Sequence, residues 1–239
     1  MKNSLKQFRQ LHDKLQLSHH PFNRSYNYLQ WAFKELDFND KTVLDIGGGN
    51  GIYSYFAKYK GAKFCMNLEP FEAGSKNIQI LDNDDDQYLS IEINNQTFQD
   101  FTHEDKFDII ILHDSINHLD EEVFCKIHSD KESYESYSKL INKMCKMLAS
   151  GGSIIVTDCS RNNFWGILGL KSPFAPSIDW HLHQAPNLII KMFKAQGMND
   201  FKLRWSPFKR FGSLGRLLSF LGFLPSFFMQ SHFNLIIKR

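Results

Sequence analysis

Three glycines at alternate positions, preceded by a carboxylate, have the spacing in this chain that most clearly indicates chemistry. Asp45 is followed by Gly47, Gly49 and Gly51. Glycine permits a tight turn and lets the backbone approach a bound molecule closely. The spacing does not fit the Gly-x-Gly-x-x-Gly pattern of dinucleotide-binding turns, which disfavours a nicotinamide dinucleotide as the ligand.

A second carboxylate, Glu69, follows about 20 residues after the glycines, a separation typical of nucleotide-binding α/β folds. It ends the apolar run 63–68, and Pro70 behind it cannot continue a strand ladder. Two carboxylate oxygens can accept from the two adjacent hydroxyls of a ribose. Alone, Glu69 would be an ordinary strand-end residue, but together with the glycine turn it is expected to hold a ribose.

The elements that must position these residues alternate along the chain. Apolar runs predict five strands, and the helical patterns 52–59 and 134–148 lie between them, the second closed by Ser150-Gly151-Gly152. Such alternation is typical of a parallel sheet with covering helices. The predicted strands are 42–44, 63–68, 88–93, 106–112 and 153–158.

Taken in order, residues 40–160 resemble the class I S-adenosylmethionine (SAM)-dependent methyltransferases. Asp45 and its glycines are similar to motif I of that family, and Phe107-Asp108-Ile109 with the polar stretch to His118-Leu119 is similar to motif IV. The resemblance implies an α/β, Rossmann-like, seven-stranded, mostly parallel sheet with an antiparallel last strand and helices on both faces. Strands six and seven would be 201–205 and 233–238.

The resemblance also implies SAM as cofactor, with S-adenosylhomocysteine (SAH) as product. The turn would wrap the methionine part of SAM, Asp45 would orient its amino end, and polar residues after strand four would lie between cofactor and acceptor. Asn94 or Asn95 stands where the family often has an Asp for the adenine amino group, and an amide oxygen can also accept there. The implied cofactor-binding residues are Asp45, Gly47, Gly48, Gly49, Gly51, Glu69, Asn94, Asn95, His113 and Asp114.

The connection 159–186 is long enough to predict a functional loop. In an extended chain, His181 and His183 would face one side. Either could remove a proton from an acceptor, and His118 is a further candidate that could instead orient its own loop. His181 and His183, together with His113 and Asp114, would also make a metal-binding set. No local motif fixes those four residues, so no metal site is expected.

Residues 208–229 carry many apolar side chains edged by Lys209, Arg210 and Arg216. A helix here would pack on its own domain, line a pocket for an apolar acceptor, contact a membrane surface or form a homodimer interface.

We expect one domain over 1–239, comprising a helical arm (1–40), a cofactor-binding core (41–160) and a substrate side (161–239) with the apolar insertion 206–231. The net charge of +2 gives no strong case for nucleic acid. The four cysteines form no Cys-x-x-Cys pair and are expected to be reduced thiols. The first ten residues lack an apolar core, and no stretch reaches the length of a bilayer span, so a cytoplasmic enzyme is expected.

The expected function is transfer of the SAM methyl group to an oxygen, nitrogen or carbon nucleophile of a small molecule with a lipid-like part. Two alternatives remain open. One is a non-catalytic subunit with the SAM-binding fold that binds a partner, and the other is a nicotinamide-dependent oxidoreductase.

Overall fold

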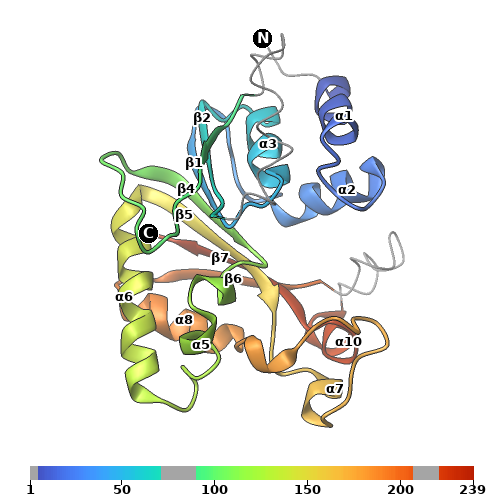
Figure 1. Ribbon diagram of the computed structural model, residues 1–239, viewed down its shortest axis with the longest axis vertical. Helices are drawn as coiled ribbons and strands as arrows, with labels where there is room; N and C mark the ends of the chain where they lie inside the picture. Colours follow the sequence, from blue (N-terminus) through green and yellow to red (C-terminus); the bar gives the residue numbers. More distant parts are fainter. Residues whose placement is uncertain (1–4, 71–89, 207–220) are drawn as a thin grey trace. The chain divides into compact units, whose positions relative to one another are not determined.

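The computed structural model describes residues 5–70, 90–206 and 221–239 (Figure 1). It contains a seven-stranded sheet in the order β3-β2-β1-β4-β5-β7-β6. β1 pairs in parallel with β2 and β4, β2 pairs in parallel with β3, and β7 is antiparallel to both β5 and β6. The predicted fold class is therefore confirmed. The strands are β1 (Thr42–Ile46), β2 (Phe64–Leu68), β3 (Glu92–Asn94), β4 (Phe107–His113), β5 (Leu148–Cys159), β6 (Asp200–Trp205) and β7 (His232–Lys238).

Along the chain, the described helices precede and separate these strands. They are α1 (Leu5–Lys14), α2 (Phe22–Ala32), α3 (Ile52–Tyr59), α5 (Glu121–Phe124), α6 (Lys131–Met147), α7 (Phe164–Ile167), α8 (Pro186–Lys194) and α10 (Phe223–Phe228), with 3₁₀ turns η3 (Asn117–Leu119) and η4 (Trp180–Leu182). None of the helices in these parts of the chain is long and apolar enough to cross a bilayer.

The chain divides into two compact units. The first comprises Met1–Leu112 with Met147–Gly152, and the second comprises His113–Lys146 with Ser153–Arg239. The expectation of one domain over 1–239 stays a prediction.

In the first unit, α1, α2 and α3 lie on the same face of β1 and β2 (Figure 1). Phe8 of α1 is fully buried and its ring stacks on Tyr59 of α3, while its edge meets Phe56. The N-terminal helix therefore packs on α3. α2 begins at Phe22, directly after Pro21, whose φ of −55° at the N-cap is compatible with a helix start.

The glycines after α6 do not form the predicted turn. α6 ends at Met147 and β5 starts at Leu148, so Ser150-Gly151-Gly152 belongs to the strand. Gly151 adopts φ +71°, and a Cβ on Gly152 would lie 2.9 Å from the carbonyl oxygen of Asp108. Gly152 is therefore needed because β5 approaches β4 closely at this position, and it does not terminate the helix.

The third strand is shorter than predicted. β3 covers only Glu92–Asn94, with Ser90 and Ile91 before it outside any strand. Tyr88 and Leu89 lie outside the described residues. The short strand leaves Asn94 inside β3, whereas Asn95 follows it directly.

Candidate functional site

The turn between β1 and α3 requires glycine at four positions for two different reasons. Gly47, Gly49 and Gly51 have φ of 68°, 52° and 78°, in the left-handed region that other residues rarely adopt. Gly48 is required by space, because a Cβ there would lie 2.0 Å from Oδ1 of Asn67 and 2.6 Å from Oδ2 of Asp45. A Cβ on Gly49, in contrast, would meet no atom of residues 5–70, 90–206 or 221–239 within 4 Å. Gly49 therefore faces the open side of the turn.

The end of β2 fixes this turn in place. The backbone N–H of Gly49 donates to Oε2 of Glu69 at 2.8 Å, and Nδ2 of Asn67 donates to the carbonyl oxygen of Gly49 at 3.1 Å. Both side chains are buried. Asn67 was not among the predicted site residues, although it lies two residues before Glu69 on the neighbouring parallel strand, opposite Asp45.

Asp45 lies beneath the turn, with only 1% of its surface exposed. Its Oδ2 accepts from the Ser54 hydroxyl at 2.8 Å, whereas its Oδ1 has no hydrogen-bond partner among the described residues. Burial raises the pKa of Asp45 to about 7, against the opposing effect of the Ser54 hydrogen bonds. A buried acceptor oxygen without a donor suits a cationic or N–H-bearing ligand group, directly or through water.

These residues fit SAM in three respects. The turn offers backbone groups around an open face at Gly49, a carboxylate stands at the tip of β2, and Asp45 has an unsatisfied oxygen. Asn94 fits less directly, since its Oδ1 accepts from the backbone N–H of Gln96 at 2.9 Å. The adenine contact proposed for Asn94 or Asn95 stays a prediction.

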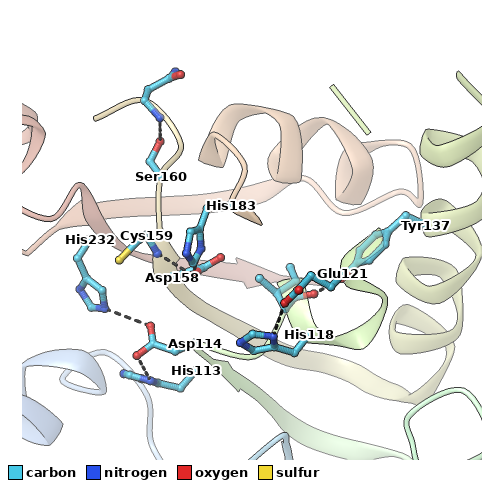
Figure 2. Close-up of polar contacts among 12 residues, drawn as sticks. His113, Asp114, His118, Glu121, Tyr137, Asp158, Cys159, Ser160, His183 and His232 are labelled. Atoms are coloured by element: carbon cyan, nitrogen blue, oxygen red, sulfur yellow. Dashed lines mark hydrogen bonds and ion pairs between the residues drawn. The ribbon is translucent and has the colours of Figure 1, made fainter. Parts of the chain in front are cut away.

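In the second unit, Asp114 lies between two histidines (Figure 2). Its Oδ2 is 3.2 Å from Nδ1 of His113, and its Oδ1 is 3.6 Å from Nε2 of His232. Both imidazoles are buried, and the Asp114 side chain is 46% exposed. His232, which was not among the predicted site residues, therefore lies beside the predicted pair His113 and Asp114.

A second acid–base pair ends β5. Nδ1 of His183 is 2.9 Å from Oδ1 of Asp158, which is fully buried and also accepts from the backbone N–H of Cys159 (Figure 2). Burial alone would lower the pKa of His183. The hydrogen bond to Asp158 and the charges of Asp158, Asp114 and Asp179 outweigh burial, so the pKa of His183 is raised.

The other two histidine candidates are placed differently. Residues 180–182 form the 3₁₀ turn η4 and not an extended segment, so His181 is exposed while His183 is largely buried. The expectation that both face one side is wrong. His118 is 60% exposed, and its Nδ1 pairs with Oε2 of Glu121 at 2.9 Å (Figure 2).

Comparison with known proteins supports the resemblance found in the sequence. A family model described as "Methyltransferase domain" matches residues 23–223. The tRNA U34 carboxymethyltransferase of Ruthia magnifica subsp. Calyptogena magnifica is 50% identical over 32 residues, which are 13% of this chain and only 10% of that protein.

Solved methyltransferase structures share the fold. A SAM-dependent methyltransferase from Mesorhizobium loti aligns with a TM-score of 0.59 at 12% identity, covering 90% of this chain and 98% of that one. One from Archaeoglobus fulgidus gives 0.58 at 11% identity, covering 96% and 98%. The plantazolicin methyltransferase BpumL in complex with SAH gives 0.55 at 13% identity, covering 99% and 91%. Because the family model spans most of the chain, this protein belongs to the methyltransferase-domain family, and SAM is its cofactor.

Proposed function

We propose that this chain transfers the methyl group of SAM to a proton-bearing nucleophile of a small-molecule acceptor with an apolar part. The observation that carries the proposal is the buried Asp158–His183 pair, with Nδ1 of His183 2.9 Å from the carboxylate. Such a pair is the usual arrangement of a general base whose orientation is fixed by a carboxylate.

SAM supplies an electrophilic methyl group on a sulfonium sulfur that is already a good leaving group. The chain therefore has to hold, orient and desolvate the reactants, and it needs a base only where the nucleophile carries a proton. The glycine turn and Glu69 supply the holding contacts, and Glu69 also stabilises the turn through the N–H of Gly49.

The hydrogen bond to Asp158 assigns the proton on His183 to Nδ1 when the ring is neutral, which leaves Nε2 as the atom that accepts a proton. Asp158 then stabilises the imidazolium that forms. Because the carboxylate is fully buried, this pairing is stronger than it would be in water.

Exposed apolar side chains favour an acceptor with a lipid-like part. They lie in two segments, 167–170 at the end of α7 and 221–228 around α10. These two helices contact each other (Figure 1). The exposed residues are Ile167, Leu168, Leu170, Leu221, Phe223, Leu224 and Phe228. The apolar insertion was predicted over 206–231, and its residues 207–220 lie outside the described part of the chain. The membrane-surface and homodimer interpretations of 208–229 stay proposals for the same reason.

A nucleic-acid acceptor is the weaker proposal. The named tRNA enzyme matches only 32 residues, and the net charge of +2 supplies little attraction for a phosphate backbone. Membership in the methyltransferase family also removes support for the nicotinamide-dependent alternative. A non-catalytic, partner-binding role remains the alternative that activity measurements must exclude.

The test is a transfer assay with methyl-labelled SAM and a panel of hydroxyl-, amine- and thiol-bearing acceptors that differ in apolar chain length. An active acceptor should lose about 10²–10⁴-fold in turnover with His183→Ala, while SAM affinity stays near normal. His181→Ala is the matched control, because it removes the exposed histidine two residues away and should leave turnover unchanged. SAM binding without transfer to any acceptor in the panel would favour the non-catalytic alternative, and labelled tRNA as the preferred acceptor would contradict the small-molecule proposal.

A further inference from the structure

The cluster of His113, Asp114 and His232 has a donor set and a geometry that the proposed acid–base chemistry does not use. Its three ligand atoms all lie within 4.8 Å of one another. The cluster lies within the second unit and shares no residue with the glycine turn or the Asp158–His183 pair, although the charge of Asp114 also acts on His183.

We propose that His113, Asp114 and His232 bind a divalent transition-metal ion such as Zn²⁺. Two imidazole nitrogens with one carboxylate form a donor set that suits Zn²⁺, Co²⁺, Ni²⁺ or Fe²⁺ rather than Mg²⁺ or Ca²⁺, which prefer oxygen ligands.

Two of the three separations between donor atoms, those from Asp114 to the two imidazoles, are close to the separations around a shared metal ion. Ligands about 2.0–2.2 Å from a tetrahedral Zn²⁺ lie about 3.4 Å apart. The distances from the Asp114 carboxylate are 3.2 Å to His113 and 3.6 Å to His232.

β5 supplies the common scaffold that brings the three residues together. The backbone N–H of Asp114 donates to the carbonyl oxygen of Thr157 at 2.7 Å. Two residues further along β5, Cys159 stands opposite His232 in the antiparallel ladder. His232 is held further by its carbonyl oxygen, which accepts from the backbone N–H of Ser206 at 2.8 Å.

Asp114 adopts φ +52°, an unusual value for a residue other than glycine. Such backbone strain is most often found where a functional geometry is imposed. The side-chain burial agrees, because the His113 and His232 side chains are only 3% and 1% exposed whereas that of Asp114 is 46% exposed. Two buried imidazoles with one solvent-accessible carboxylate would leave a fourth position of a tetrahedral ion for water or another ligand, as in catalytic zinc sites.

The inference concerns metal binding alone, so it is tested without SAM or an acceptor. Tag-free, EDTA-treated full-length chain is titrated with Co²⁺ while its visible d–d absorption is recorded, and Zn²⁺ is then added as competitor. We expect one equivalent of Co²⁺ to bind and Zn²⁺ to displace it.

Asp114→Asn and His232→Gln should each weaken binding by at least about 10–100-fold, the usual effect of changing even an outer partner of a metal ligand. Asn tolerates a positive φ, so Asp114→Asn should fold even if His232→Gln does not. His118→Ala is the matched control, because it removes an exposed histidine that also pairs with a carboxylate but belongs to no group of three ligands in the described part of the chain.

Absence of cobalt absorption in folded wild-type protein would overturn the inference. Equal Co²⁺ affinity in wild type and Asp114→Asn would overturn it too, as would an equal loss in the His118→Ala control.

Discussion

Replacing Asp45 by Asn should stabilise the ligand-free protein at alkaline pH but not at acid pH. Asp45 is fully buried, and its pKa is raised from 3.8 to about 7 by that burial. A carboxyl group whose pKa is raised in the folded state contributes its full stability below pH 3.8, and this contribution is lost as the pH rises through about 7.

The size of the effect follows from the two pKa values. Their difference corresponds to about 4 kcal/mol at 1.36 kcal/mol per pH unit. Between pH 5 and pH 8, the free energy of unfolding of Asp45→Asn should rise relative to wild type by about 2–3 kcal/mol. An amide at this position can still accept from Ser54, and it carries no charge at either pH.

Urea unfolding of both proteins at pH 5 and pH 8, without SAM, measures this difference. Asp108→Asn is a control of opposite sign. Burial opposes the shift at Asp108, but hydrogen bonds from Thr42 and the charges of Lys41 and Lys63 lower its pKa, so the ionised form stabilises the fold. That variant should therefore lose stability relative to wild type as the pH rises to about 4, and the difference should stay constant between pH 5 and pH 8. A stability difference between Asp45→Asn and wild type that is the same at both pH values would refute the reasoning.

Glu69→Ala should weaken SAM binding by about 1.5–3 kcal/mol, the value of charged hydrogen bonds, and unchanged affinity by calorimetry would make Glu69 only a support of the turn. The base-limited rate should rise with pH through an inflection above 6.5, since His183 must be neutral to act and its pKa is raised; an inflection at lower pH would exclude His183. Asn163→Ala should lower the free energy of unfolding by at least about 2 kcal/mol, because its buried amide donates to Phe227 O and Ser231 Oγ. The exposed neighbour Asn162 offers the control, and equal effects of Asn162→Ala and Asn163→Ala in urea unfolding would contradict this role.

The strand-level fold was predictable because buried parallel strands carry strong apolar patterns. α3 starts and ends at the predicted residues, since Gly51 immediately precedes a clear helical pattern. The helix boundary before β5 was not predictable, because Gly151 and Gly152 are typical of a turn. Only the structure shows that Gly152 lies against the carbonyl oxygen of Asp108.

The candidate site was predictable where one strand end carries it. Asp45, Glu69, His113 and Asp114 all follow from the rule that carboxyl ends of parallel strands carry ligand-binding residues. The same rule could have selected Asp158 at the end of β5. Selecting His232 needs the antiparallel pairing of β7 with β5 as well. His232 is the first residue of β7, and this pairing places it opposite Cys159, the last residue of β5.

Other site features depend on tertiary packing that no local pattern encodes. Asn67 and Ser54 support the glycine turn through contacts to Gly49 and Asp45. The sequence spacing of His181 and His183 favoured a shared direction, but η4 rotates them apart because Asp179 caps that turn through the N–H of His181.

The most direct test of the central claim is a calorimetric titration of the full chain with SAM, using wild type and Gly49→Val. The Val side chain would enter the open space beside Gly49, which the cofactor is expected to occupy. Gly169→Val is the matched control, because Gly169 has a similar φ of 67° and equally open surroundings but lies outside the turn. We predict one SAM bound per chain in wild type and in Gly169→Val, and none in folded Gly49→Val. Undiminished SAM binding by folded Gly49→Val, or no binding by wild type, would contradict the assignment of residues 45–51 as the cofactor site.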